Sequence, residues 1–450
     1  MGTTQSVEYA IAGAGVAGLS CAFHLSRAGQ HDYMVLERAP EVGGTARSHT
    51  VDGFTFDYAS HILYTKSPYV ARLYDELLGS NRLERRREAW IYSHGTFTRY
   101  PFQANLHGLP RDVVYECLVA FLHARDQRYA TENLNFAEWA ELTFGRGIAK
   151  HFMLPYNRKQ WKFPLDQMTF AWVGNRVLRP PLDDVVRGAL MSQQKGFGPN
   201  NTFLYPRHGG IDIIPRGLHQ RLGADGANVR CGAPIAQIMP EQRRLILESG
   251  EKIGYGRLIY TLPLPALARL VRQPPPELAR ALERLAYNRH YCLLFGVKGR
   301  EYRERMRVYL PEDRFLAHRL GFPQAVQPDA APAGWGSIYA EITEARAPER
   351  RMSVQQMTER TIADLRAVGV VDAGDAIEPK GCLTLDPAYP IYTLTHADDV
   401  ALIHGYLEQH GIYPAGRFAD WRYFNIDHTI LSAKAVVEKL SAGRGLEVAA

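Results

Sequence analysis

Strand-like and helix-like patterns of apolar residues follow one another at the start of the chain. Residues 7–12 form a short apolar run typical of a buried strand, and residues 32–36 are read as a second strand. Between them, residues 18–27 place apolar side chains at helical spacing. A strand, a helix and a strand within about thirty residues predict one βαβ unit.

The middle of the chain is mainly helical in its pattern. Amphipathic helices are expected at 113–124, 136–143, 147–153 and 183–191. Residues 68–78, 266–271, 352–367 and 430–440 have the same character. Residues 90–100 alternate like a hairpin that turns at His94-Gly95. The helical stretch from 110 to about 191 is therefore the best candidate for an inserted domain.

Strands return in the second half. Short strands at 229–231, 235–239, 244–247 and 258–260 predict a meander that rejoins the first unit, and 289–298 and 336–344 predict long strands of a separate sheet. The fold class is α/β: a Rossmann-like domain with an inserted helical domain and an antiparallel β-sheet domain. The expected domains are 1–65 with 200–270 and 400–450, then 104–195, then 88–103 with 285–399.

Composition and charge narrow the class of protein. The net charge of +6 is too mild for a nucleic-acid binder, and no apolar run is long enough for a membrane span. The densest basic run, Arg85 to Arg87, is flanked by Glu84 and Glu88 and is interpreted as the solvated end of a helix. The five scattered cysteines favour a reduced, cytoplasmic location. No metal-ligand spacing stands out, and no metal is predicted.

A dinucleotide fingerprint sits inside the βαβ unit. Gly13, Gly15 and Gly18 form a G-x-G-x-x-G that follows the first strand and opens the helix. The first glycine permits the tight turn, the second lets pyrophosphate approach, and the third lets helix and strand pack closely. Glu37 ends the second strand, nineteen residues after Gly18, where the fingerprint needs an acid for the adenosine ribose. NAD satisfies the same fingerprint as FAD.

Later segments favour FAD. A glycine doublet and an arginine at 43–47, and the strand Gly53 to Asp57, resemble the amine-oxidase and protoporphyrinogen-oxidase superfamily of flavoproteins. Near the end of the chain, Gly416-Arg417 and Asn425-Ile426-Asp427 precede the last helix, which Asp427 is expected to cap. The residues predicted to bind FAD are Gly13, Gly15, Gly18, Glu37, Arg38, Gly44, Thr45, Arg47, His61, Gly416, Arg417, Asn425 and Asp427.

Several further blocks, in order, make the chain similar to the UDP-galactopyranose mutases over residues 8–437, closer in several motifs to the eukaryotic-type enzymes. The blocks are 100–103 (YPFQ), 152–161 (FMLPYNRKQW), 171–176 (AWVGNR), 201–206 (NTFLYP), 308–313 (VYLPED) with Arg319, 388–390 (AYP) and 421–423 (WRY). Ala59-Ser60-His61 lies where the family carries a histidine near the flavin, although the family usually has glycine before it. Because glycine makes a loop mobile, the presence of Ala59 and Ser60 affects whether the loop that carries His61 moves as it does in the family.

The resemblance implies a substrate site and its catalytic groups. Arg176 and Arg319 match the two arginines that grip the substrate diphosphate, and His61 matches the flavin histidine. Without the resemblance, an arginine is more often a surface ion-pair partner and a histidine is more often structural. The residues implied to bind substrate are Tyr100, Gln103, Phe152, Tyr156, Asn157, Trp161, Arg176, Tyr309, Arg319, Tyr389 and Tyr423.

The implied reaction interconverts a UDP-linked pyranose and furanose without net redox change. Reduced FAD is the active form, and its N5 is the covalent nucleophile at the anomeric carbon. Expected partners are a nucleotide-sugar, most simply a UDP-sugar, and a reductant such as NAD(P)H or a reductase; homo-oligomers are left open. Three alternatives remain: an oxidase or desaturase of the amine-oxidase superfamily, a mutase for another nucleotide-linked sugar, and a catalytically silent nucleotide-sugar-binding flavoprotein.

Overall fold

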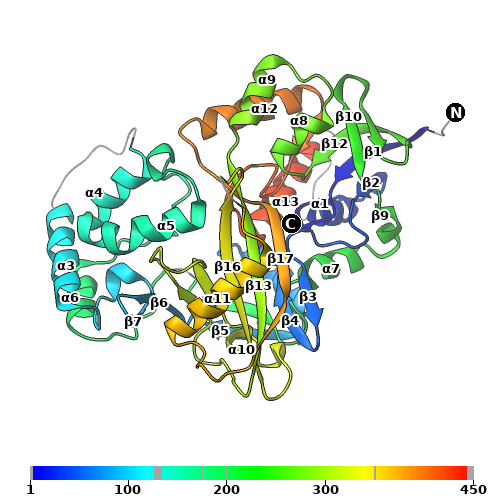
Figure 1. Ribbon diagram of the computed structural model, residues 1–450. Coiled ribbons are helices and arrows are strands. Elements are labelled where there is room, and N and C mark those ends of the chain that lie inside the picture. The colour runs from blue at the N-terminus through cyan, green and yellow to red at the C-terminus, as the bar shows by residue number, and fades with distance from the viewer. Residues whose placement is uncertain (1–3, 126–133, 175, 199, 349–350, 443–450) are drawn as a thin grey trace.

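The computed structural model describes residues 4–125, 134–174, 176–198, 200–348 and 351–442. Figure 1 shows three regions: a sheet with helices around β1 and β2, a second sheet built on long strands in the centre, and a group of helices, α3 to α6, on the far side of that sheet. Each region draws on segments that lie far apart in the sequence.

The first region contains the predicted βαβ unit. Strand β1 (Thr4–Ala12) pairs in parallel with β2 (Tyr33–Leu36), and helix α1 (Val16–Arg27) connects them. Residues 10–12 of β1 are fully buried, because an apolar core lies on each face of the sheet: Ile11 belongs to one core, and Ala10 and Ala12 belong to the other. The strand order is β10-β11-β12-β1-β2-β9, with β18 beside β12. The added strands are β9 (Val229–Arg230), β10 (Ile235–Met239), β11 (Arg244–Leu247), β12 (Lys252–Tyr260) and β18 (Ile412–Pro414).

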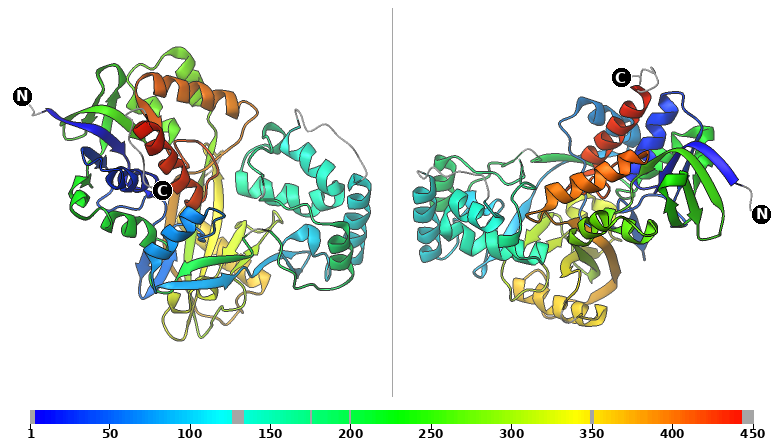
Figure 2. Two further views of the ribbon diagram at one scale, coloured as in Figure 1. Left: turned by 180° about the vertical axis from the view of Figure 1, so that it is seen from behind. Right: turned by 90° about the horizontal axis from the view of Figure 1, so that it is seen from above.

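Helix α13 (Ile426–Ala442) packs alongside α1, although the two lie at opposite ends of the chain (Figure 2). Its apolar side chains Ile430 and Val437 share a core with Leu19 and Leu25 of α1. The remaining helices of this region are α2 (Pro68–Leu78), α7 (Ile213–Gln220), α8 (Leu267–Leu270), α9 (Pro276–Arg284) and α12 (His396–Gln409). A small hairpin, β3 (Ser48–Val51) and β4 (Phe54–Asp57), leads from it toward the second sheet.

The second sheet has the order β17-β13-β16-β15-β14-β6-β7. Its central strand β13 (Tyr287–Lys298) is antiparallel to both of its long neighbours, β16 (Trp335–Ala345) and β17 (Ile377–Pro390). The shorter strands are β6 (Ala89–Ser93), β7 (Thr96–Arg99), β14 (Arg307–Tyr309) and β15 (Arg319–Gly321), and helices α10 (Pro323–Val326) and α11 (Val354–Val368) accompany the sheet. The predicted hairpin at 90–100 is therefore found as β6 and β7.

The helical region consists of α3 (Arg111–Arg125), α4 (Phe136–Ile148), a π-helical turn (Ala149–Met153), α5 (Leu154–Trp161) and α6 (Leu182–Leu190). One buried side chain ties it to the second sheet. Lys159 of α5 donates to the carbonyl oxygens of Leu310, Glu312 and Ala317 at 2.8, 3.0 and 2.7 Å. These three hydrogen bonds satisfy a buried ammonium and hold the helices against the segment between β14 and β15.

Three predictions about local structure are wrong. Residues 82–86 form strand β5 (Arg82–Arg86), paired with β8 (Thr202–Pro206), so the Arg85–Arg87 run is not a helix end. Strand β9 pairs in parallel with β2 at the far edge of the first sheet and does not belong to the meander. Helix α13 starts at Ile426, so Asp427 lies inside its first turn and does not cap it. The predicted domain boundaries remain a prediction.

Candidate active site

All three regions contribute to one large cavity of about 1490 Å³. It extends from the glycine turn after β1, past the loop that carries His61, to side chains of α5 in the helical region. A volume of this size exceeds what one drug-sized ligand usually requires. The cavity is therefore large enough for a dinucleotide cofactor together with a second ligand.

The glycine turn has the geometry that the fingerprint requires. Gly13 has a φ of +102°, and a Cβ there would lie 2.7 Å from the hydroxyl of Thr261. A Cβ on Gly18 would lie 1.9 Å from the carbonyl oxygen of Gly13, so α1 packs directly on the turn. No side chain caps the N-terminus of α1, which begins after Gly15. The first amides of the helix are thus available to an anionic ligand.

The second glycine segment packs against the first. Gly15 and Gly43 form an isolated bridge, and a Cβ on Gly44 would lie 3.0 Å from the Cα of Gly15. Glu37 accepts the backbone N–H groups of Ala14 and Ala39 at 2.8 and 2.9 Å, which fixes its carboxylate at the cavity wall. Side-chain-free backbone, a free helix N-terminus and a wall carboxylate fit the pyrophosphate and ribose of FAD.

Most residues predicted to bind FAD line this cavity: Gly13, Gly15, Glu37, Arg38, Gly44, Thr45, Arg47, His61, Arg417, Asn425 and Asp427. Gly18 and Gly416 do not. Gly18 has the packing role just described, as expected. Gly416 was placed among the cofactor ligands, but a Cβ there would lie 2.4 Å from that of Ala17, so its backbone packs on α1.

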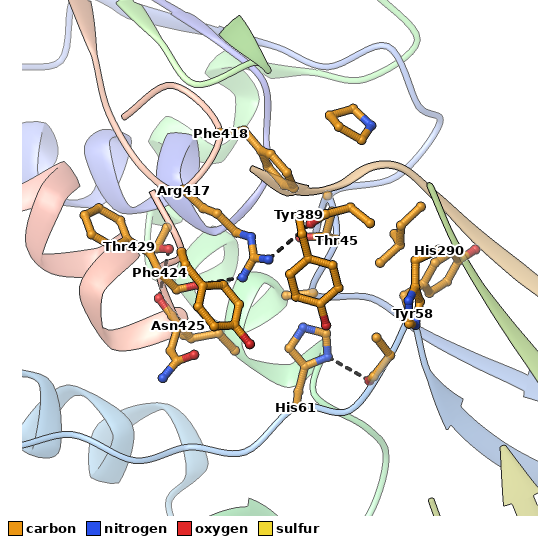
Figure 3. Close-up of a pocket in the computed structure, with 18 of the residues that line it drawn as sticks. Thr45, Tyr58, His61, His290, Tyr389, Arg417, Phe418, Phe424, Asn425 and Thr429 are labelled. Carbon is orange, nitrogen blue, oxygen red and sulfur yellow. Dashed lines mark hydrogen bonds between the residues drawn. The ribbon is translucent and has the colours of Figure 1, made fainter. Parts of the chain in front are cut away.

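The loop that carries His61 is held in a strained conformation. Ala59 has a φ of +109°, which non-glycine residues rarely adopt. The His61 ring is hydrogen-bonded through Nδ1 to the carbonyl oxygen of Ala59 at 3.0 Å, as drawn in Figure 3. Burial lowers the pKa of His61, and Asp57 offsets only part of this effect. His61 therefore faces the cavity as a neutral imidazole at pH 7.

Ser60 connects this loop to the second sheet. Its N–H group donates to Glu341 of β16 at 3.2 Å, and its hydroxyl accepts a hydrogen bond from Arg307 of β14. These contacts offset the strain at Ala59. Ser60 thus anchors the loop that carries His61 to Arg307 and Glu341 of the second sheet.

Arg319 lies on β15 and is paired with a carboxylate. It is 9% exposed, and its Nε and Nη2 both donate to the same oxygen of Glu341, with the Nε at 2.8 Å. Glu341 is fully buried, and although burial opposes its ionisation, Arg319 holds its pKa below the usual value. Arg319 also lines the cavity, and Glu341 offsets part of its charge.

Two histidines complete this buried group. His290 and His318 each have Nε2 at 3.6 Å from Glu341, and no ring nitrogen of either finds a hydrogen-bond partner in the described residues. Burial lowers the pKa of His290 to about 4 and that of His318 well below its usual value. The ligand atoms of the three residues lie within 4.8 Å of one another. A cation there would compete with Arg319 for Glu341, so the arrangement fits neutral imidazoles and water better than a metal.

Arg176 and Arg417 lie among tyrosines of the cavity wall, and Figure 3 shows Arg417 close to Tyr389 and His61. Arg176 is exposed, stacks 4.9 Å from the Tyr423 ring and donates to the Trp172 carbonyl oxygen at 3.0 Å. Arg417 lies 5.1 Å from the Tyr389 ring and 5.0 Å from the Tyr423 ring. Within the described residues it donates to the carbonyl oxygens of Phe424 and Ala388, and Figure 3 labels Arg417, Tyr389 and Phe424. Neither guanidinium has a carboxylate partner among the residues described, so both leave positive charge available to a ligand.

A further pair of arginines was missed by the sequence analysis. Arg87 and Arg307 line the cavity beside Tyr309, and Arg87 donates to the Tyr309 hydroxyl at 2.9 Å. Burial opposes ionisation of Tyr309, but Arg87, Arg307 and Arg319 outweigh it and lower its pKa to about 7. Nothing in the charge pattern distinguished Arg87 from its neighbours. Its position after β5 became informative only once that strand was seen to pair with β8.

The structure places most residues assigned to the substrate at the cavity wall and one of them in the core. Residues Tyr100, Gln103, Phe152, Tyr156 and Asn157 line the cavity, as do Arg176, Tyr309, Arg319, Tyr389 and Tyr423. Trp161 does not: it is 0% exposed and packs in the core against Trp172. Its indole N–H donates to Asn157 at 3.0 Å, so it positions Asn157 and has no direct access to a ligand.

The fold and the site together define a flavoprotein enzyme. Residues 16–376 match the family of flavin-containing amine oxidoreductases, and the chain belongs to that family. Its cofactor is therefore the flavin FAD, consistent with the glycine turns and Glu37. In the described part of the chain, no helix has the length and apolar character needed to cross a bilayer.

Solved structures resemble the chain over nearly its full length. A reduced UDP-galactopyranose mutase is 26% identical, with a TM-score of 0.91 over 98% of this chain and 96% of that one. A putative protoporphyrinogen oxidase from Exiguobacterium sp. 255-15 is 19% identical, with a TM-score of 0.71 over 98% of this chain and 99% of that one. The second likeness shows the fold alone.

Curated sequences point to a different chemistry. A zeta-carotene-forming phytoene desaturase from Myxococcus xanthus is 24% identical over 387 residues, which are 76% of this chain and 72% of the desaturase. A 15-cis-phytoene desaturase from Synechococcus elongatus is 38% identical over 101 residues, only 21% of either protein. The chain thus spans about a fifth of that second relative.

Proposed function

We propose that this enzyme is an FAD-dependent mutase that interconverts the pyranose and furanose forms of a nucleotide-linked sugar, of the UDP-galactopyranose type. The observation that carries the proposal is the lining of the cavity opposite the glycine turns. Arginines without carboxylate partners and tyrosine hydroxyls gather there, notably Arg176 with Tyr389 and Tyr423. Such a lining suits a diphosphate. The TM-score of 0.91 to a UDP-galactopyranose mutase also supports it.

In the proposed reaction, bound reduced FAD supplies a nucleophilic nitrogen at the anomeric carbon of the sugar. The chain's own residues provide charge and position. Arg176 and Arg319 stabilise the negative charge that grows on the diphosphate as its bond to the sugar breaks. Tyr389 and Tyr423 offer hydroxyl donors without adding charge. His61, which is neutral and fixed by its hydrogen bond to the Ala59 carbonyl oxygen, orients the bound flavin.

The nucleotide end of the substrate is assigned to the helical region. Phe152 stacks between Phe102 and Tyr156, with ring separations of 5.1 and 5.5 Å, so it presents a rigid aromatic edge to the cavity. Gln103 lines the same wall, although its amide N–H donates to the Leu178 carbonyl oxygen at 2.7 Å. A flat base such as uracil suits this wall. We also propose an electron donor such as NAD(P)H or a reductase, and a cytoplasmic location on the basis of five unpaired cysteines.

The second candidate is an FAD-dependent desaturase or oxidase, which the likeness to phytoene desaturases favours. An apolar polyene needs an apolar channel. The buried guanidinium of Arg307 and the half-buried one of Arg417 would then have to lose water without gaining an anion, at a high cost in free energy. The mutase is therefore the better match to the cavity.

The deciding experiment incubates the protein with UDP-galactofuranose without oxygen, with its flavin either oxidised or reduced by dithionite. We expect chromatography to show UDP-galactopyranose only with reduced flavin, with no stoichiometric consumption of reductant. The Arg176→Ala variant is the matched control for the site. Equal turnover by the oxidised protein, or hydrogen peroxide formed in step with product in air, would contradict the mutase and favour the oxidase.

A further inference from the structure

Among the described residues, two arginines at the cavity wall make no ion pair with a carboxylate. Arg307 is 7% exposed, and its Nε is buried without a hydrogen-bond partner. The Nε of Arg87 is in the same situation. Within the described residues, neither guanidinium lies within ion-pair distance of a carboxylate, in contrast to Arg319 with Glu341. Buried positive charge without a partner is costly, which indicates that an anion from outside the protein completes the arrangement.

The two arginines are rigidly positioned around Tyr309. Arg87 donates to the Tyr309 hydroxyl and to Asn200 Oδ1, both at 2.9 Å, and its guanidinium lies 4.5 Å from the Tyr100 ring. The Tyr100 and Tyr309 rings stack at 5.0 Å. Tyr309 shares the positive field, which lowers its pKa to about 7 even though burial opposes ionisation. Each of these side chains lines the cavity.

Their place in the cavity separates them from the proposed diphosphate contacts of Arg176. Arg307 donates to the hydroxyl of Ser60, the residue next to His61. Arg176 instead lies against Tyr423 and Trp172, which belong to the segment before the last helix and to the helical region. In the proposed reaction the sugar occupies the part of the cavity beside the His61 loop. Arg319, the second arginine assigned to the diphosphate, pairs in register with Tyr309 across β14 and β15, but its side chain is held by Glu341. The pair Arg87 and Arg307 is not held in this way, and we place it at the sugar.

We propose that Arg87 and Arg307 form a binding site for an acidic group on the sugar, so that the enzyme prefers a nucleoside-diphosphate-linked sugar acid, such as a uronic acid, over the corresponding neutral hexose. The inference rests on the proposed function, because it assumes that a nucleotide-sugar binds here. A planar carboxylate matches the fork of a guanidinium, and the second guanidinium supplies further donors. This site would select among sugars and would leave the nucleotide contacts unchanged.

Binding of three probes to the FAD-loaded protein tests the inference: UDP, UDP-galactose and UDP-galacturonate, titrated by calorimetry. We expect the wild type to bind UDP-galacturonate at least about tenfold more tightly than UDP-galactose. In Arg307→Met this preference should disappear, while the affinity for UDP changes less than about threefold. Arg87→Met, which keeps Arg307, should show a reduced preference. Arg307→Lys should retain part of it, because charge remains without the fork.

Arg305→Met is the matched control, since Arg305 lies two residues before Arg307 and stacks outside the cavity on Trp90 and Phe97. It should keep the full preference, and the flavin absorbance spectrum of each variant reports folding. Equal weakening of UDP and UDP-galacturonate by Arg307→Met would overturn the inference, because the pair would then serve the diphosphate. A wild type that prefers UDP-galactose would overturn it as well. If none of the probes binds, the proposed function itself fails and the acid site falls with it.

Discussion

Arg176 and Arg319 illustrate how two residues with one assigned role differ in their surroundings. Arg176 is exposed, and its contacts with the described residues are to carbonyl oxygens and a tyrosine ring. Arg319 is buried, and its guanidinium donates a hydrogen bond to the fully buried carboxylate of Glu341. Removing the first takes a charge out of the cavity. Removing the second also leaves Glu341 without its cation.

We therefore expect Arg176→Ala and Arg319→Ala to separate activity from stability. Arg176→Ala should lower kcat/KM for the nucleotide-sugar by roughly thirty- to a thousandfold, about 2–4 kcal/mol, with an unchanged free energy of unfolding. Arg319→Ala should lower activity and also reduce the free energy of unfolding by about 3–5 kcal/mol, because a buried charge loses its partner.

Urea unfolding and steady-state kinetics on the two variants make this comparison. Arg319→Ala combined with Glu341→Gln is the matched control, because it removes both charges and should recover part of the lost stability. If Arg319→Ala is as stable as the wild type, the ion pair is not the structural element described above. Near-normal kcat/KM for Arg176→Ala would mean that the diphosphate does not bind beside Arg176.

A second residue-scale prediction concerns the strained backbone at Ala59. Glycine adopts a φ of +109° without steric cost, so Ala59→Gly should raise the free energy of unfolding by about 1 kcal/mol. Ala279→Gly, a replacement within helix α9, is the matched control and should lower it by about 1 kcal/mol. Chemical denaturation of both variants measures the difference. A loss of stability in Ala59→Gly would show that the contacts of Ser60 impose no strain.

At the scale of single residues, the sequence predicted some of the cavity-lining residues correctly and missed others. Motif order identified Tyr309, Tyr389 and Tyr423, and all three line the cavity. It could not show that Trp161 turns into the core, because helical spacing is the same for a ligand wall and for a packing face. Nor could it distinguish Arg87 from Arg85 and Arg86, since only strand pairing decides which of three adjacent arginines faces inward.

Helix α1 is the element on which the cofactor site depends most directly. It packs on the glycine turn at Gly18, where a Cβ would lie 1.9 Å from the Gly13 carbonyl oxygen. Gly18→Ala should push the helix away from the turn, so that the protein binds less FAD. The free energy of unfolding should also fall, by several kcal/mol, which is on the order of the cost of overpacking a core. Flavin absorbance per protein and thermal unfolding measure the two effects.

Gly405→Ala is the control for this change. Gly405 lies in helix α12, and a Cβ there would have no atom within 4 Å. The substitution should leave FAD content unchanged and raise the free energy of unfolding by up to about 1 kcal/mol, the helix propensity gained. Full FAD occupancy in Gly18→Ala would contradict the role given to this contact.

Strand β13 carries the second element-scale prediction, through His290. Its pKa in the folded protein is about 4, whereas the unfolded chain has the ordinary value near 6.5. As pH falls through this window, the unfolded chain binds a proton that the folded protein does not, so stability is lost on acidification. The loss from this one group should reach about 2–3 kcal/mol at pH 4.5.

Urea unfolding of wild type and His290→Gln at pH 7.0 and pH 4.5 measures this contribution. The variant should lose less stability on acidification than the wild type by that amount. His107→Gln, which changes an exposed histidine, should follow the wild-type profile. Parallel profiles for wild type and His290→Gln would mean that His290 gains a proton in the folded protein as readily as in the unfolded chain.

Elements with a regular pattern of apolar and polar residues were predicted from the sequence. Elements whose residues alternate irregularly between buried and exposed positions were not. The βαβ unit, the hairpin at 90–100 and strands β13 and β16 have regular patterns and were found close to their predicted bounds. Strand β17 was missed because it pairs through shifts in register and alternates irregularly between buried and exposed positions. Strand β9 is only two residues long, so its partner depends on the whole chain fold and not on its own sequence.

At the scale of the whole molecule, three regions share one cavity and are tied together at a few points. Lys159 joins α5 to the segment between Tyr309 and Arg319, and Ser60 joins the His61 loop to Arg307 and Glu341. The assembly of this cavity could not be read from sequence. The segments that meet there are separated by up to several hundred residues, and only resemblance to a known family brought their motifs together.

The unpaired guanidiniums of the cavity have one more consequence, for the electron affinity of the cofactor. Arg87, Arg307 and Arg417 create a positive potential in the same enclosed space that the flavin enters. Such a field favours the anionic, two-electron-reduced form of the ring over the neutral oxidised one. The midpoint potential of the bound flavin should therefore lie above that of free FAD, and Arg307→Met should shift it downward, as dye-coupled reductive titration would record. Binding of an anionic ligand such as UDP should act in the same direction as the mutation, so that the protein holds electrons most firmly while it waits for substrate.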